Sequence, residues 1–238
     1  MPCPIVLAVA ALLLGGCTLA GELTTTTCPS SRRLEPAVAD YVDFVQVDGI
    51  TYHAGMRRPA GRELREADLG AEHSVVRCKL ADHIPEGPGH LDGDAAYLDQ
   101  GTTLYEVRGY RPRFRLAAWR EGRLVLYEAD DNPAARTWGD LLDLGGKVRR
   151  IAVADDHLRP RATVEDRRQV ARLVDLPLQS PLGTRRACPD RRNLVLAFHL
   201  DDGTATALAY DPQSRRLDCR YPLPGPFDAA VRARLAAG

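Results

Sequence analysis

Short apolar runs separated by turn residues fill the chain from residue 43 to residue 128. Asp48-Gly49 lies between two such runs, and this dipeptide is a strong signal for a tight β-hairpin. Glu121-Gly122 separates another two runs and predicts a second hairpin. About seven short strands with little helix predict a small antiparallel sheet or a partly open barrel over residues 41–130. The expected strands are 43–47, 50–54, 74–80, 95–98, 103–107, 113–119 and 123–127.

The second half carries a different pattern. Turn residues over 131–146 predict a linker, with a short helix at 138–144. Residues 147–238 predict a β-α-β-β-β-α unit in which Thr163 caps a helix that runs to Leu176 and is stopped by Pro177. The expected fold class is therefore α+β with two small domains. Residues 34–41 are expected as a helical or irregular lead-in, and 81–94 as an exposed loop.

The N-terminus begins with an apolar run over residues 5–14, which is too short to span a bilayer. Small residues follow it, as in a secretory signal peptide. No Lys or Arg precedes the run, so we expect the translation start to lie upstream. The polar, Thr-rich stretch after the run is typical of a flexible tether.

The residues Leu14-Gly15-Gly16-Cys17 resemble the bacterial lipoprotein signal. The resemblance implies that residues 1–16 are removed and that Cys17 carries a diacylglyceryl thioether with palmitate-type chains. Each buried CH₂ group of such chains contributes about 0.8 kcal/mol to anchoring. Residues 17–40 would then form the lipid anchor and tether. A signal peptide cut elsewhere and an uncleaved anchor are the alternatives.

Four cysteines remain beyond Cys3 and Cys17, and an even number in an exported protein favours disulfides. Four cysteines allow three connectivities. Proximity within each expected domain favours Cys28–Cys78 and Cys188–Cys219. A four-thiolate metal site is the competing interpretation, but the sequence has no CxxC pair.

A wider resemblance rests on VDGITYHA, on GTTLYEVRGY within the first half and on LVLAFHLDDGT in the second. These stretches are similar to uncharacterised secreted lipoproteins of Gram-positive bacteria. The shared residues belong to β-patterns and turns. The resemblance therefore implies architecture and location, and it implies no activity.

The charged residues argue against nucleic acid as a partner and suggest an anionic partner of another kind. The chain has 32 basic and 32 acidic residues, and this balance speaks against a nucleic-acid binder. Four arginines surround Tyr110 and Phe114 and are candidates for binding an anionic wall polymer, a lipid headgroup or an acidic protein. The alternative is a solvated strand face. The four are Arg108, Arg111, Arg113 and Arg115.

Histidines and aspartates crowd the segment 73–94 and could serve a metal-dependent enzyme or a hydrolase. They lack the HxH, HxxxH or HExxH spacing of a metal site, and the more common role of such residues is a solvated polar loop. No GxSxG motif or phosphate-binding glycine loop is present. We therefore assign no catalytic residue, metal ligand or cofactor. The residues in question are His73, Asp82, His83, His90, Asp92 and Asp94.

The sequence thus predicts a lipoprotein anchored through Cys17 to the extracytoplasmic face of the cell membrane. The expected role is a non-catalytic binding or assembly module of the cell envelope, with an envelope protein or a wall polymer as partner. The alternative is an envelope hydrolase or metal-dependent enzyme that uses the segment 73–94.

Overall fold

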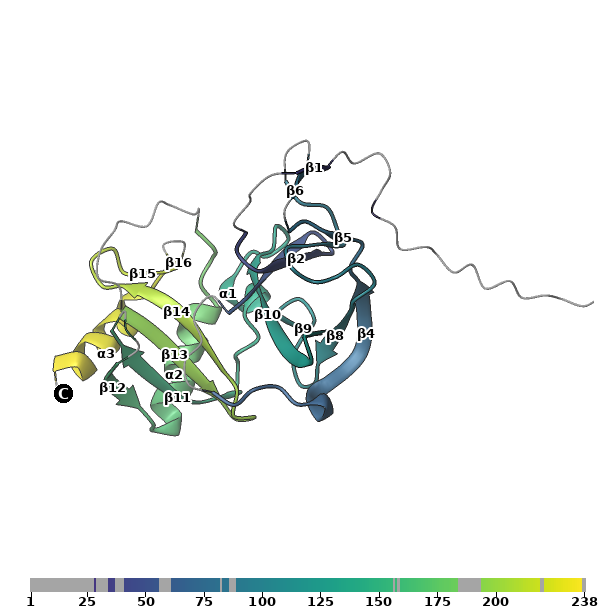
Figure 1. The fold of residues 1–238 in the computed structure, drawn as a ribbon. Coiled ribbons are helices and arrows are strands. Elements are labelled where there is room, and N and C mark those ends of the chain that lie inside the picture. Colours follow the sequence, from purple (N-terminus) through teal and green to yellow (C-terminus); the bar gives the residue numbers. More distant parts are fainter. Residues whose placement is uncertain are drawn as a thin grey trace, which may run out of the picture.

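The computed structural model describes residues 28, 34–36, 41–55, 61–81, 83–85, 89–155, 157, 159–183, 194–218 and 221–236. Within them the chain forms two β-sheet units with few helices, which confirms the expected α+β class (Figure 1). The expected signal peptide and Cys17 lie outside the described residues, as do Cys188 and Cys219.

The first unit is an eight-stranded sheet in which every neighbouring pair is antiparallel except β5 and β7. Strand β4 is preceded by the short 3-10 helix η1, Glu66–Asp68. The strand order is β4 (Leu69–Val75), β8 (Thr103–Val107), β9 (Arg115–Arg120), β10 (Arg123–Asp131), β3 (Ile50–Ala54), β2 (Phe44–Val47), β7 (Asp94–Ala95) and β5 (Cys78–Lys79).

Both predicted hairpins are present. Strands β2 and β3 pair with Val47 opposite Ile50, and the two turn residues Asp48 and Gly49 have φ of 53° and 71°. Strands β9 and β10 are joined in the same way through Glu121 and Gly122, with φ of 51° and 74°. Two successive positive φ values match the twist of the flanking strands, and glycine adopts them without a Cβ clash.

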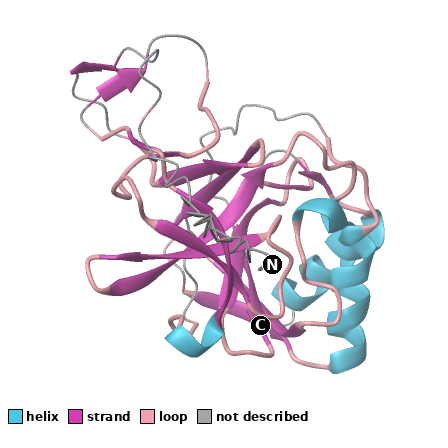
Figure 2. Ribbon diagram, turned by 90° about the vertical axis from the view of Figure 1, so that its right-hand side faces the viewer, coloured by secondary structure: helices cyan, strands magenta, loops and turns pink. Residues whose placement is uncertain are grey.

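The second unit is a six-stranded antiparallel sheet with helices beside it (Figure 2). Its order is β12 (Pro160–Val164), β11 (Val148–Ala154), β13 (Leu194–Leu200), β14 (Ala205–Asp211), β15 (Arg216–Leu217) and β16 (Tyr221–Pro222). The helices are α1 (Trp138–Leu141), α2 (Arg167–Leu178) and α3 (Gly225–Ala236). None of the helices in the described part is long and apolar enough to cross a membrane.

The predicted start and end of the long helix are wrong. Thr163 lies in β12, opposite Ala152 of β11, where a β-branched residue is favoured. Asp166 is the actual cap, and its carboxylate accepts a hydrogen bond from the Gln169 N–H at 2.9 Å. Pro177 lies inside the last turn of α2 and does not stop it.

Two segments expected as irregular contain strands. Strand β1 (Leu34–Pro36) pairs antiparallel with β6 (His83–Pro85), one from the expected lead-in and one from the expected loop. Both segments contain proline, which is disfavoured within a sheet. Each strand has its proline at its C-terminal end, in a sheet of only two strands, and proline is tolerated at such edge positions.

One hydrophobic core extends through both units. It contains Tyr52 and Leu104 from the first sheet and Phe198 from the second. Trp138 of α1, in the expected linker, is 1% exposed and belongs to the same core. The segment between the two sheets therefore packs as part of the core.

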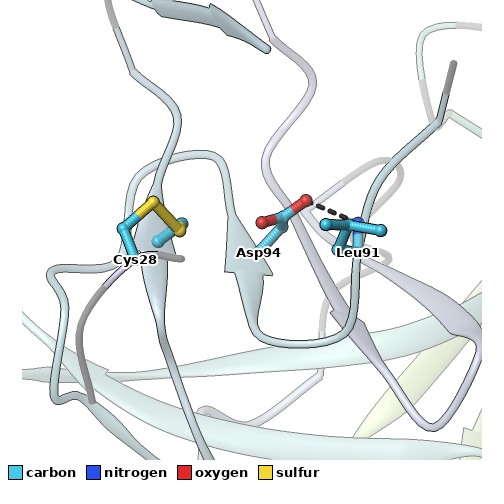
Figure 3. Close-up of a disulfide and its surroundings, with 4 residues drawn as sticks. Cys28, Leu91 and Asp94 are labelled. Atoms are coloured by element: carbon cyan, nitrogen blue, oxygen red, sulfur yellow. Dashed lines mark hydrogen bonds between the residues drawn. A yellow bond between two sulfur atoms is a disulfide. The ribbon is translucent and has the colours of Figure 1, made fainter. Parts of the chain in front are cut away.

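The Cys28–Cys78 disulfide is present, with the two Cα atoms 4.8 Å apart. It joins Cys28 to β5 beside the turn between Leu91 and Asp94 (Figure 3). A small cluster of Phe44, Leu80 and Ala96 surrounds Cys78. Cys28 is thereby fixed covalently to the first sheet.

His199 generates a prediction about pH. It lies in β13 at 5% exposure, directly opposite Arg150 of β11. Burial lowers its pKa below the ordinary value, and the positive charges of Arg150 and Arg149 lower it further. The unfolded chain then binds the proton more tightly than the folded chain. The contribution of His199 to the free energy of unfolding is therefore fully present above pH ~6.5. It decreases as the pH drops toward the lowered pKa.

We expect urea unfolding between pH 7.5 and 5.5 to show this loss, at no more than about 1.4 kcal/mol per pH unit for one proton. His199→Gln should flatten the slope, and Arg150→Gln should reduce it in part. An unchanged slope in His199→Gln would contradict the assignment.

Candidate functional site

A cleft of about 310 Å³ lies where strand β10 of the first unit meets strand β14 of the second. Along β10 the side chains alternate, with Val125 and Tyr127 buried in the core while Leu126 and Glu128 line the cleft. Residues 204–209 form the facing wall, and Arg62 and Glu63 lie at its rim. The cleft is therefore built from segments far apart in the sequence.

Glu128 is held in place from both units. Its Oε1 lies 2.8 Å from Arg115 Nε and 2.6 Å from Arg115 Nη2, while its Oε2 accepts a hydrogen bond from the Thr206 hydroxyl at 2.9 Å. Arg115 Nη1 donates to the Thr204 hydroxyl at 2.9 Å. Arg115 of β9, Glu128 of β10, Thr206 of β14 and Thr204, which directly precedes β14, thus form one network. We call it the Arg115 network.

Arg115 is fully buried, which is unusual for a guanidinium. Its charge is offset by Glu128 and by the faces of two rings, since its Cζ lies 4.6 Å from the centre of Tyr110 and 4.8 Å from that of Phe114. Burial raises the pKa of Tyr110 to about 12, although Arg115 opposes this shift. Tyr110 therefore stays neutral at physiological pH and serves as a ring face for the guanidinium.

The polar groups of the cleft are mostly acidic. Among the described residues of its lining there are four carboxylates, those of Glu63, Glu128, Asp130 and Asp218, and one guanidinium, that of Arg62. Arg62 is itself engaged with Asp68, through bonds of 2.6 and 2.9 Å. His53 Nδ1 lies 3.7 Å from Asp130 Oδ2 on the first-unit wall. The cleft can thus hold an apolar group on its leucines and alanines and a cation beside its carboxylates.

The four candidate arginines do not share one surface. Arg115 is interior, and Arg108 Nε donates to the Leu69 carbonyl at 2.6 Å. Arg111 contacts the carbonyl of Gly139, and its Nε lies 3.6 Å from Asp143. Arg111 and Arg113 do come together, in a separate hollow of about 200 Å³ that also contains Arg136. Arg136 was not among the candidate arginines because it lies in the expected linker.

The histidines and aspartates of 73–94 have separate partners. His73 Nε2 lies 3.1 Å from Asp48, and the ring of His90 lies 4.1 Å from the ring of Phe44. Asp92 accepts a hydrogen bond from the Gly49 N–H at 2.8 Å, and buried Asp94 accepts one from the Leu91 N–H at 2.6 Å (Figure 3).

Asp82 and the side chain of His83 lie outside the described residues. Among the residues that the structure describes, no three His, Cys, Asp or Glu side chains gather as a metal site would require. The segment 73–94 thus uses Asp92 and Asp94 to fix turns.

Sequence reasoning missed the cleft as a whole. The alternation of Leu124, Leu126, Glu128 and Asp130 along β10 does place these residues on one face, and this signal was available. Thr206, the hydrogen-bond partner of Glu128, lies 78 residues away in the sequence, and no local pattern relates the two.

No family model matches this chain, and neither the curated proteins nor the solved structures contain a match.

The Arg115 network predicts a large loss of stability when either charge is removed alone. Arg115→Met should lower the free energy of unfolding by about 2–4 kcal/mol, because it leaves Glu128 and Thr204 without their main partner. Glu128→Leu should also destabilise, since it leaves a buried cation. In the double variant the two losses should overlap by at least about 1 kcal/mol in denaturant unfolding. Strictly additive losses would show that the network does not couple the two strands.

Proposed function

We propose that this protein is a lipid-anchored binding or assembly module on the extracytoplasmic face of the cell membrane, and that its ligand occupies the cleft between the two sheets. The observation that carries the proposal is the cleft itself. It is concave, it combines apolar walls with a few fixed polar groups, and it lies at the junction of two units, where ligand sites concentrate.

The polar groups of the cleft support binding in preference to chemistry. Glu128 has both oxygens occupied by Arg115 and Thr206, and the Thr204 hydroxyl bonds to Asp202 at 2.8 Å. Groups held in this way orient a ligand at little cost in entropy. A hydrolase or metal-dependent enzyme built on segment 73–94 gains no support, because the described residues of that segment have separate partners.

The disulfide supports a position close to the membrane. Cys28 follows Cys17 by eleven residues and is joined covalently to β5. Even a fully extended segment of that length reaches only about 40 Å. With the lipid on Cys17, the first unit would therefore be kept near the bilayer, where envelope partners are found.

In-cell photo-crosslinking tests the proposal. A benzoylphenylalanine at position 63, an exposed position at the cleft rim, should give defined adducts on irradiation. The matched control is benzoylphenylalanine at position 172, which is exposed on α2 and is not among the residues that line the cleft. Position 63 should yield adducts in the membrane fraction, and position 172 should not.

Cys17→Ala provides the second arm of this experiment. It should release the protein from membranes or block its processing, and it should remove the adducts that depend on the anchor. Membrane retention of Cys17→Ala with processing unchanged would contradict the lipid anchor. Equal adducts at positions 63 and 172, or none at 63, would contradict the cleft as the binding site.

A further inference from the structure

One wall of the cleft is a strand edge. Strand β14 pairs with β13 along Ala205–Tyr210, but on its other side it pairs with β15 only at Tyr210 and Asp211. Within the described part of the chain, residues 205–208 therefore have no strand on that side, and the cleft lies against it. Unpaired edges of this kind are templates for an added strand.

The direction of the backbone groups follows from the β13–β14 hairpin. The Leu200 N–H bonds to the Thr204 carbonyl, so the residues that bond toward β13 are the even-numbered ones of β14. The odd-numbered residues point outward, and Ala209 confirms this because its carbonyl accepts from the Asp218 N–H at 2.7 Å. Ala207 therefore directs its N–H and C=O into the cleft, where no described residue bonds to them.

The open edge has defined ends. A Cβ placed on Gly61 would lie 2.8 Å from the Ala205 nitrogen, so the chain at residue 61 closes one end. Asp218 closes the other end through Ala209. The length between them is about four strand residues, or ~13 Å. Only a short extended segment fits between Gly61 and Asp218.

Charge and surface favour a basic peptide. Three carboxylates besides Glu128 line the cleft, and that of Glu63 is exposed. The leucines of β10 supply an apolar floor, and the same face of the sheet continues across the strand pair to Trp119, which is 43% exposed. A peptide that adds to β14 would therefore meet acidic groups and apolar surface together.

We infer that the cleft takes a short, extended peptide segment carrying a basic side chain, which adds to the edge of β14 through Ala207. This inference rests on the proposed binding function and names its ligand class. Main-chain hydrogen bonds to Ala207 hold the segment in register, and Glu63 and Asp130 receive the basic side chain. Ala205, Ala207 and Ala209, the residues of β14 whose backbone groups point away from β13, all have small side chains, which allows a second backbone to approach closely.

Three synthetic peptides test it on the full-length chain in detergent. The probe is acetyl-Ala-Arg-Ala-amide. The first control replaces Arg by Glu, and the second carries a methyl group on the Arg backbone nitrogen, which removes the donor of the ladder. The Arg peptide should bind at least tenfold more tightly than either control, and it should slow hydrogen exchange of the Ala207 amide at least tenfold.

Variants separate the two recognition elements. Asp130→Asn with Glu63→Gln should abolish the preference for Arg over Glu. Ala207→Pro should abolish binding, and its N–H makes no bond to β13, so the sheet should tolerate it. If that variant does not fold, the methylated peptide on the unaltered protein answers the same question.

Equal binding of the three peptides, or unchanged exchange at Ala207, would overturn the inference. So would a stable dimer that protects Ala207 without peptide, because the edge would then be filled by a second copy of the chain. Adducts at position 63 with no peptide binding would leave the binding module standing and reject the peptide as its ligand.

Discussion

The contact on which the rest of this structure depends is the ion pair between Arg115 and Glu128. A guanidinium that is fully buried carries a desolvation cost of several kcal/mol, and it persists only where charge and hydrogen bonds offset that cost. Here Glu128, Thr204 and two aromatic faces do so together. Since Thr204 and Thr206 belong to the second unit, the same contact fixes the position of β14 against β10. The cleft is the space that this arrangement leaves open.

Contacts of other kinds also hold the two units together. The Arg62 N–H donates to the Gly203 carbonyl at 2.9 Å, and its Nε donates to the Asp202 carbonyl, which ties the loop before β4 to the β13–β14 turn. In addition to these polar contacts, one hydrophobic core contains residues of both sheets together with Trp138. A cleft bounded in this way is already formed without a ligand, and preformed sites lose less entropy on binding. This is the property expected of a binding module.

Local features of the fold could be predicted from the sequence, and long-range ones could not. The turns at Asp48-Gly49 and Glu121-Gly122 and the pair Cys28–Cys78 followed from turn chemistry and from proximity. Strand β12 was mistaken for a helix start because Thr163 precedes Asp166 at capping distance. The burial of Arg115 was not expected, because three other arginines, Arg108, Arg111 and Arg113, lie within the seven residues before it. Only the pairing of β9 with β10 and the approach of β14 place it inside.

The cleft is preformed only if the two sheets behave as one body, and native-state hydrogen exchange measures this directly. Tyr127 of β10 and Phe198 of β13 are core residues of different units, at 0% and 2% exposure. We expect their amides to exchange with opening free energies that agree within about 1 kcal/mol, because both require the same global unfolding. Opening of one sheet at a much lower free energy than the other would show two independent domains, and the cleft between them would then not be preformed.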